Sequence, residues 1–208
     1  MKLKVILMSA LLSLGGTLTA NAQSAGQVRF GVTGGMNVTG ITDLGDTESR
    51  IGFNLGLRGE YNFSKNVYVN AGLLWSMKGA KYDAEIAGYK GTFKVNPSYL
   101  EIPIAVGGRY FISDGLSIFA ETGPYFAVGV CGKSKTDVKI GNIKSTEKVD
   151  FFGDDGSGAK RFDAGWGLRA GVEVNKFQVH LGYEHGFVNI FDDDCKNWNF
   201  NVGVSYMF

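Results

Sequence analysis

The feature that most constrains this chain is a strict alternation of apolar and polar residues. In Ile51–Phe63 the odd-numbered positions are Ile, Phe, Leu, Leu, Gly, Tyr and Phe, whereas the even-numbered positions are Gly, Asn, Gly, Arg, Glu and Asn. Successive side chains of a β-strand point to opposite faces, so this segment has one apolar and one polar face. A helix would spread the same residues over all of its sides. The pattern therefore predicts a strand.

The same alternation recurs along the chain and gives eight predicted strands, with no convincing helical period between them. The strands are Gln27–Thr39, Ile51–Phe63, Val67–Gly79, Ser98–Ile112, Leu116–Val130, Phe162–Val174, Phe177–Asn189 and Asn197–Phe208.

The connections between these strands alternate in length. Three are short runs of turn-forming residues, namely Ser64–Asn66, Ser113–Gly115 and Asn175–Lys176. The other four are expected to be long polar loops, namely Gly40–Arg50, Ala80–Pro97, Cys131–Arg161 and Ile190–Lys196. Short turns at one end and long loops at the other are typical of outer-membrane barrels. The sequence therefore predicts an all-β fold, an eight-stranded antiparallel up-and-down transmembrane β-barrel.

The size of the side chains indicates which face is inside. The apolar face carries Phe53, Leu55, Trp75 and many similar residues, which cannot fit inside a barrel of eight strands. The opposite face is rich in glycine, which suits a crowded lumen. We therefore expect the apolar face to contact lipid, with aromatic residues concentrated near both ends of the strands.

Charged residues accompany the glycines on the predicted inner face. Five cations and five carboxylates make up this set: Arg29, Arg58, Glu60, Lys78, Glu101, Arg109, Glu121, Arg169, Glu173 and Glu184. Unpaired charges in so narrow a space would be costly, so we expect a paired polar network that plugs the lumen. A gated ion path and paired catalytic carboxylates are the alternatives.

The first residues are typical of a secretory signal. Lys2 and Lys4 precede the apolar run Val5–Leu14, and Ala20 and Ala22 supply small residues for cleavage. We predict a signal peptide at 1–22 and one outer-membrane β-barrel domain at 23–208; the alternative is a buried N-terminal helix. The formal net charge of +1 gives no electrostatic footprint for nucleic acid. No motif for haem, flavin or nucleotide occurs, so no cofactor is expected.

A few residues in the predicted loops could carry chemistry. Cys131 and Cys195 form a possible disulfide in an oxidising compartment, the alternative being two thiols. Asp192–Asp194 and Asp154–Asp155 could bind a divalent cation, but a solvated acidic loop is favoured. His185 could serve an enzyme at the external rim, yet it has the lipid-facing parity and no nucleophile motif accompanies it. We therefore predict no enzymatic activity, no catalytic residues and no metal site.

Several motifs resemble a known family. Tyr99–Ile104, Gly108–Tyr110, Gly123–Tyr125 and Ser205–Phe208 are similar to the Bacteroidetes outer-membrane β-barrel domain family, often called PorT-like. The resemblance implies an eight-stranded barrel in the outer membrane of a Gram-negative bacterium. Phe208 itself resembles the C-terminal aromatic signal that the barrel-assembly machinery reads; the alternative, compatible with this one, is that it is the last aromatic residue of the rim.

These observations favour a small outer-membrane protein with a structural, adhesive or surface-interaction role and a plugged lumen. Its expected partners are outer-membrane lipid, the barrel-assembly machinery during biogenesis, and an extracellular or envelope protein. A narrow channel and an accessory of the envelope secretion machinery remain alternatives, and an outer-membrane enzyme is the least favoured.

Overall fold

The computed structural model describes residues 25–42, 47–86, 89–140, 143–153, 157–191 and 194–208. The predicted signal peptide at 1–22 lies outside these residues. Ten strands form the described part: β1 (Val28–Ile41), β2 (Thr47–Asn62), β3 (Val67–Met77), β4 (Ala80–Ile86), β5 (Tyr89–Ser113), β6 (Leu116–Ile140), β7 (Ile143–Asp150), β8 (Phe162–Val174), β9 (Phe177–Gly186) and β10 (Asn197–Met207). Within the same residues, no helix is long and apolar enough to cross a bilayer.

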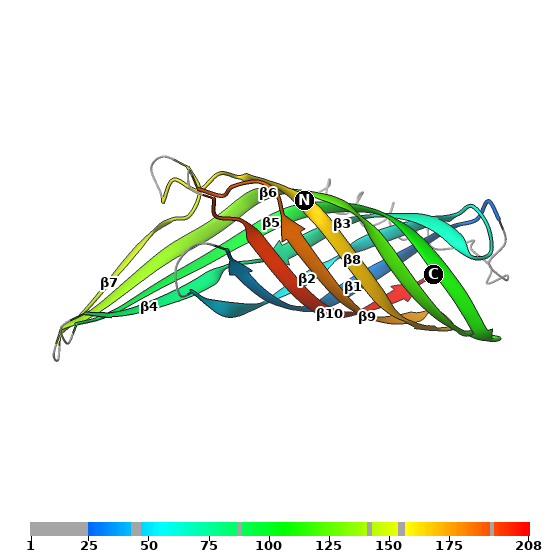
Figure 1. The fold of residues 1–208 in the computed structure, drawn as a ribbon, viewed down its shortest axis with the longest axis horizontal. Helices are drawn as coiled ribbons and strands as arrows, with labels where there is room; N and C mark the ends of the chain where they lie inside the picture. The colour runs from blue at the N-terminus through cyan, green and yellow to red at the C-terminus, as the bar shows by residue number, and fades with distance from the viewer. Residues whose placement is uncertain (1–24, 43–46, 87–88, 141–142, 154–156, 192–193) are drawn as a thin grey trace, which may run out of the picture.

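Eight of the ten strands close into a ring (Figure 1). Going round the ring, β1, β2, β3, β5, β6, β8, β9 and β10 pair in that order, and β10 returns to β1. Every one of these pairings is antiparallel, and the three short connections join strands that are neighbours in the ring. Closure leaves the barrel itself without a free sheet edge. A lipid environment requires this, because unpaired backbone groups cannot find hydrogen-bond partners in hydrocarbon. The predicted antiparallel up-and-down barrel is confirmed.

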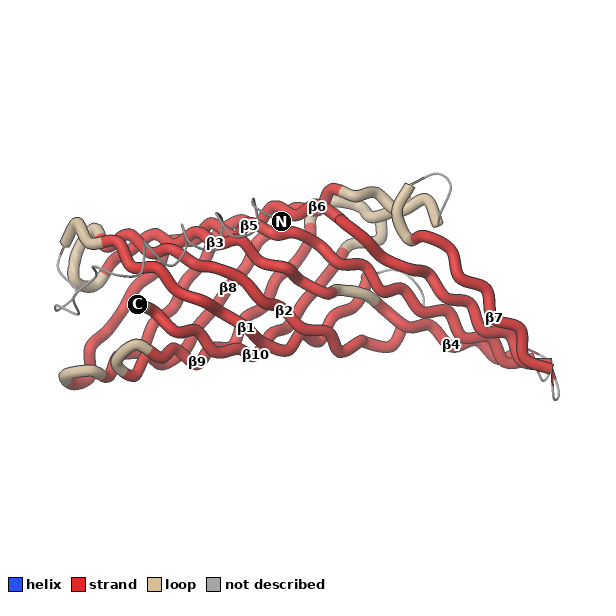
Figure 2. Tube along the Cα trace, turned by 180° about the vertical axis from the view of Figure 1, so that it is seen from behind, coloured by secondary structure: helices blue, strands red, loops and turns tan. Residues whose placement is uncertain are grey.

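Two of the predicted long loops are wrong, because they are largely strands. The segment Ala80–Pro97 holds β4 and the first part of β5, and the segment Cys131–Arg161 holds the last part of β6 and all of β7. Beyond the membrane neither face of a strand needs to be apolar, so the alternation fades there while backbone pairing continues. Figures 1 and 2 show the result, a four-stranded extension of β4–β7 that projects from the loop end of the barrel.

The wall of the barrel has the two faces that the alternation predicts. Outward side chains such as Leu55 and Phe53 are exposed by 64% and 55%, respectively. Inward side chains of the same strand, such as Arg58 and Glu60, are buried. A barrel whose outside is apolar all round, and whose inside is polar and closely packed, is built for a lipid exterior.

Glycines on the inner face let large lumen side chains pack against the wall. A Cβ atom at Gly107 would lie 2.4 Å from Cζ of Tyr68, and one at Gly129 would lie 2.2 Å from Cζ of Phe152. Because aromatic rings are rigid, these two positions have no room for a larger residue. The glycine-rich face of the sequence thus has a packing role in the lumen.

Candidate functional site

The structure places all ten predicted charged residues on the inner face of the barrel, and each takes part in at least one ion pair. The pairs are Arg29–Glu60, Arg29–Glu173, Arg58–Glu121, Lys78–Glu101, Lys78–Glu184, Arg109–Glu60, Arg109–Glu173 and Arg169–Glu121. They form three groups along the barrel axis, which we call the turn-end, middle and loop-end groups.

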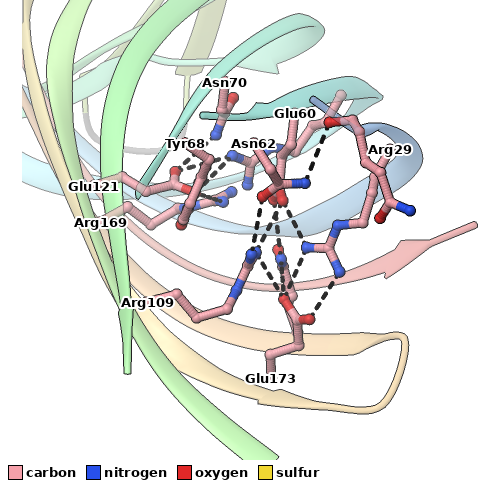
Figure 3. A network of polar contacts seen from close by, with 12 residues as sticks. Arg29, Glu60, Asn62, Tyr68, Asn70, Arg109, Glu121, Arg169 and Glu173 are labelled. Carbon is pink, nitrogen blue, oxygen red and sulfur yellow. Dashed lines mark hydrogen bonds and ion pairs between the residues drawn. The ribbon is translucent and has the colours of Figure 1, made fainter. Parts of the chain in front are cut away.

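The turn-end group joins two carboxylates to two guanidinium groups. Glu60 accepts hydrogen bonds from Arg29 at 2.6 Å and from Arg109 at 2.9 Å. Glu173 accepts from Arg29 at 2.8 Å and forms an ion pair with Arg109 at 3.1 Å. The Gln178 amide donates to both carboxylates. Two positive and two negative charges therefore compensate one another in this group (Figure 3).

The middle group is built round one carboxylate. Glu121 on β6 is paired with Arg58 at 2.9 Å and with Arg169 at 2.8 Å. It also accepts hydrogen bonds from the Tyr68 hydroxyl at 2.8 Å and from the Asn70 amide at 2.9 Å (Figure 3). These donors come from β2, β3 and β8, so one carboxylate ties together distant parts of the wall.

The loop-end group is built round a buried lysine. Only 1% of the Lys78 side chain is exposed; its Nζ lies 2.8 Å from Glu101 and 3.7 Å from both Asp163 and Glu184. The same Nζ lies 4.3 Å from the centre of the Tyr125 ring. Three carboxylates round one ammonium make this the acidic end of the lumen.

Asp163 is a lumen residue that the sequence analysis missed. It is 1% exposed and accepts a hydrogen bond from the Asn197 amide at 2.9 Å. Its position has the same parity as Arg169 and Glu173 in the strand Phe162–Val174. Applying the same inward parity to the first residues of that strand would have identified Asp163.

A small cavity separates the middle group from the loop-end group. Its volume is about 80 Å³, and its polar lining includes Arg58, Glu101, Glu121, Glu184 and Asn199. A polar space of this size holds a few water molecules. On the turn side the cavity meets the middle ion pairs, and on the loop side it meets the group round Lys78.

An apolar cluster, which we call the aromatic cap, lies beyond Lys78. Tyr99 packs edge-on against Phe152 at 5.6 Å between ring centres, Phe152 against Phe151 at 4.9 Å, and Phe151 against Phe191 at 5.9 Å. The cluster also includes the following buried residues from the strands and from the segments after β7 and β9: Ile41, Ala80, Val95, Tyr125, Ala127, Ala159, Ile190 and Cys195.

Backbone hydrogen bonds hold the cap segments to the wall. The amide of Phe151 donates to Gly132 on β6 at 3.0 Å, and the amide of Gly129 donates to Arg161 at 2.6 Å. The two cap segments are joined by a bond from the Lys160 amide to the Ile190 carbonyl at 2.8 Å. The predicted long loops at this end therefore contribute ordered apolar structure to the mouth of the barrel.

Cys131 and Cys195, the predicted possible disulfide, are not bonded to each other in the structure. A register shift between Ser98 and Tyr99, opposite the end of the lipid-facing part of β6, leaves Cys131 exposed. Cys195 is buried in the aromatic cap. The two side chains thus lie in different environments, one outside the wall and one within it.

The remaining candidates do not assemble into a reaction centre among the described residues. Asp154, Asp155, Asp192 and Asp193 lie outside those residues, and the described side chains hold no group of three potential metal ligands. The His185 ring lies against Tyr183 and Phe187 on the outer face, with ring centres 6.5 Å and 6.4 Å away.

A family model for the outer membrane protein beta-barrel domain matches residues 9–208. The chain belongs to this family. The match covers every strand of the structure and places the protein in the outer membrane.

The comparison with solved structures found outer-membrane proteins at low sequence identity. OprG of Pseudomonas aeruginosa is 12% identical with a TM-score of 0.50, and the match covers 90% of this chain and 99% of that one. Neisserial surface protein A is 14% identical with a TM-score of 0.45 over 86% and 97% of the two chains. The Yersinia pestis attachment invasion locus protein Ail, in complex with a heparin analogue, is 18% identical with a TM-score of 0.44 over 88% and 99%. The search of curated proteins found no match.

Proposed function

We propose that this protein is a non-conducting outer-membrane barrel that acts through its external surface. The observation that carries the proposal is the filling of the lumen from both sides of the central cavity. The middle and turn-end groups occupy one side, and the Lys78 group and the aromatic cap occupy the other. Each group is fixed by partners on several strands, so opening a path would break several buried ion pairs at once.

The extension of β4–β7 is the surface that remains available for interaction. β5 and β6 are 25 residues long, about twice the length of their ring neighbours β3 (11 residues) and β8 (13 residues). A membrane of ordinary thickness needs far fewer residues per strand, so the excess lies outside it. A rigid sheet that projects from the loop end suits a structural or adhesive role better than a mobile loop does.

Two observations favour particular alternatives. The central cavity would be the inner section of a narrow channel if the groups on either side of it moved apart. The motif Tyr99–Ile104, one of those on which the PorT-like resemblance depends, supplies Glu101 to the loop-end group and Tyr99 to the aromatic cap. The resemblance supports a Bacteroidetes origin and a role as an accessory of the envelope secretion machinery.

A non-enzymatic role is part of the proposal. Its support is the position of His185 on the outer face, away from the inward carboxylates, with aromatic neighbours on either side. A general base needs a substrate proton within hydrogen-bonding reach, and a membrane-facing ring offers no pocket for one.

Solute flux into liposomes tests the proposed closed lumen. Mature protein is reconstituted, and osmotic swelling is followed with urea, glycerol and small sugars. We expect wild-type vesicles to swell no faster than protein-free vesicles, and the variant Lys78→Ala/Phe152→Ala to swell faster with the smallest solutes. Swelling of wild-type vesicles at the rate of an open porin would overturn the closed lumen and favour the channel.

A further inference from the structure

Four lysines lie side by side across the extension. The strand register pairs Lys81 on β4 with Lys94 on β5, Lys94 with Lys135 on β6, and Lys135 with Lys148 on β7. We call these four residues the lysine row. Residues directly opposite in neighbouring strands share one face of the sheet, with Cα atoms about 5 Å apart. The strands of the row can be followed in the extension in Figure 2.

Like charges directly opposite one another destabilise a sheet, so the row requires compensation. The structure shows part of this charge compensation. Lys81 is paired with Glu48 at 2.9 Å, and Lys135 with Asp137 at 2.7 Å. Among the described side chains, no carboxylate is paired with Lys94 or Lys148.

The same face carries one more lysine close to the row. Lys133 is two residues before Lys135 and is paired with Asp150. Five lysines thus share this face with the carboxylates of Glu48, Asp137 and Asp150, and the backbone register places Asp83 in the same row as Asp137, which leaves a net charge of +1. Two rows further from the barrel, the backbone register aligns three lysines with one glutamate, namely Glu85, Lys90, Lys139 and Lys144, which adds two more positive charges.

The lysine row lies on the outer side of the extension. The opposite side of the same strands carries Val95, which is 1% exposed and packs in the aromatic cap above the lumen. Lys94 has the other parity and so faces away from the barrel axis. This outer side continues the lipid-facing surface of β5 and β6, where Leu100 and Val128 are exposed by 41% and 50%.

The row lies just outside the lipid-facing band, on the external side of the barrel. Leu100 is paired with Trp75, which belongs to the aromatic rim at the loop end. Lys94 lies six residues before Leu100 in β5, on the external side. At about 3.3 Å per residue and a tilt near 40°, six residues rise about 15 Å along the membrane normal. Long lysine side chains can extend from this height back toward the membrane, so phosphates at the outer surface of the bilayer are the lipid groups nearest to them.

We propose that the lysine row binds phosphate groups of lipids in the outer leaflet. Two lysines without a carboxylate partner, the net positive charge of the face and its continuity with the lipid-facing surface carry the proposal. A soluble anionic glycan would use the same charges, but it would not require them to follow the lipid band. The proposal depends on the outer-membrane location and not on a closed lumen.

Binding of lipid A to the full mature protein in a non-ionic detergent tests the proposal. Native mass spectrometry compares lipid A carrying two phosphates with lipid A from which both phosphates have been removed. We expect wild-type protein to favour the phosphorylated form by at least tenfold. Each lysine near an anionic surface contributes roughly fivefold, so Lys94→Gln/Lys148→Gln is expected to lower the affinity about 25-fold. The matched control Lys65→Gln/Lys176→Gln removes two lysines at the short-turn end and is expected to bind as wild type does.

Three results would overturn the proposal. They are equal binding of the two lipids by wild type, equal losses in the two double variants, and tight binding of a soluble sulfated oligosaccharide that lipid A does not displace. The heat-dependent gel shift of a folded barrel is recorded for every variant. If Lys94→Gln/Lys148→Gln fails that check, the dependence of wild-type affinity on salt decides, because phosphate contacts weaken as ionic strength rises. A folded barrel with no phosphate preference would refute the lysine row alone and leave the proposed function standing.

Discussion

Arg58 on β2 and Glu121 on β6 form an ion pair of 2.9 Å between strands that are not neighbours in the ring. The pair crosses the lumen, and Arg169, Tyr68 and Asn70 converge on the same carboxylate. The contacts therefore brace the wall from within. Removing one partner of such a buried pair leaves the other charge without compensation, which is more costly than the pair itself is stabilising.

The first prediction concerns this carboxylate. Glu121→Gln should lower the free energy of unfolding by about 3–5 kcal/mol, because Arg58 and Arg169 would keep their charges in a buried site. Urea unfolding in lipid vesicles measures the change. Glu147→Gln on exposed β7 is the control and should be nearly neutral. A loss below 1 kcal/mol at Glu121 would show that the middle group does not stabilise the barrel.

A second prediction concerns the aromatic cap. In Gly129→Ala the new methyl group would lie about 2.2 Å from the Phe152 ring, so the ring must move and the cap must loosen. We expect a loss of about 1–3 kcal/mol in stability together with faster protease cleavage between β7 and β8. Gly108→Ala is a matched control on the neighbouring strand β5, since nothing lies within 4 Å of its added atom. Identical cleavage of the two variants would argue against the packed cap.

The two cysteines should differ in reactivity. Cys131 is exposed and Cys195 is buried in the cap, so a maleimide should label the folded protein once and the denatured protein twice. Mass spectrometry of the intact protein counts the labels. Full protection of both thiols until a reductant is added would instead indicate a disulfide.

A lysine introduced on the lipid-facing band should lower the stability more, the closer it lies to the centre of the bilayer. Leu57 is at the middle of the outward face of β2, between the exposed aromatic Phe63 at the turn end and Ile51 at the loop end. Leu57→Lys should cost about 2–4 kcal/mol, and Phe63→Lys at the rim about 0–1 kcal/mol. Equal costs from urea titrations in vesicles would contradict the assignment of this face to hydrocarbon.

The part of the fold inside the membrane was predictable, because two solvents act on it there. Hydrocarbon outside and a crowded polar lumen inside impose the alternation seen in Ile51–Phe63, and the same alternation placed Arg58 and Glu121 inside. The extension was missed because water on both faces removes that constraint; Lys94 and Lys135 pair through the backbone and leave no apolar period. The aromatic cap was missed for another reason. Tyr99 and Phe152 are brought together by tertiary packing, and no local pattern reports such a contact.

The outward orientation of the apolar face is the claim on which the other conclusions depend, and the native tryptophans test it. Trp75 and Trp166 are exposed by 41% and 46% on the loop side of the lipid-facing band. Trp198 lies at the same level as Trp166, because both residues are paired with His185 of β9. The measurement is quenching of their fluorescence by lipids brominated at different depths, with wild-type protein in vesicles. We predict stronger quenching by bromines near the headgroups than by bromines near the bilayer centre. Fluorescence that no brominated lipid quenches would show that this face does not contact hydrocarbon and would contradict the account.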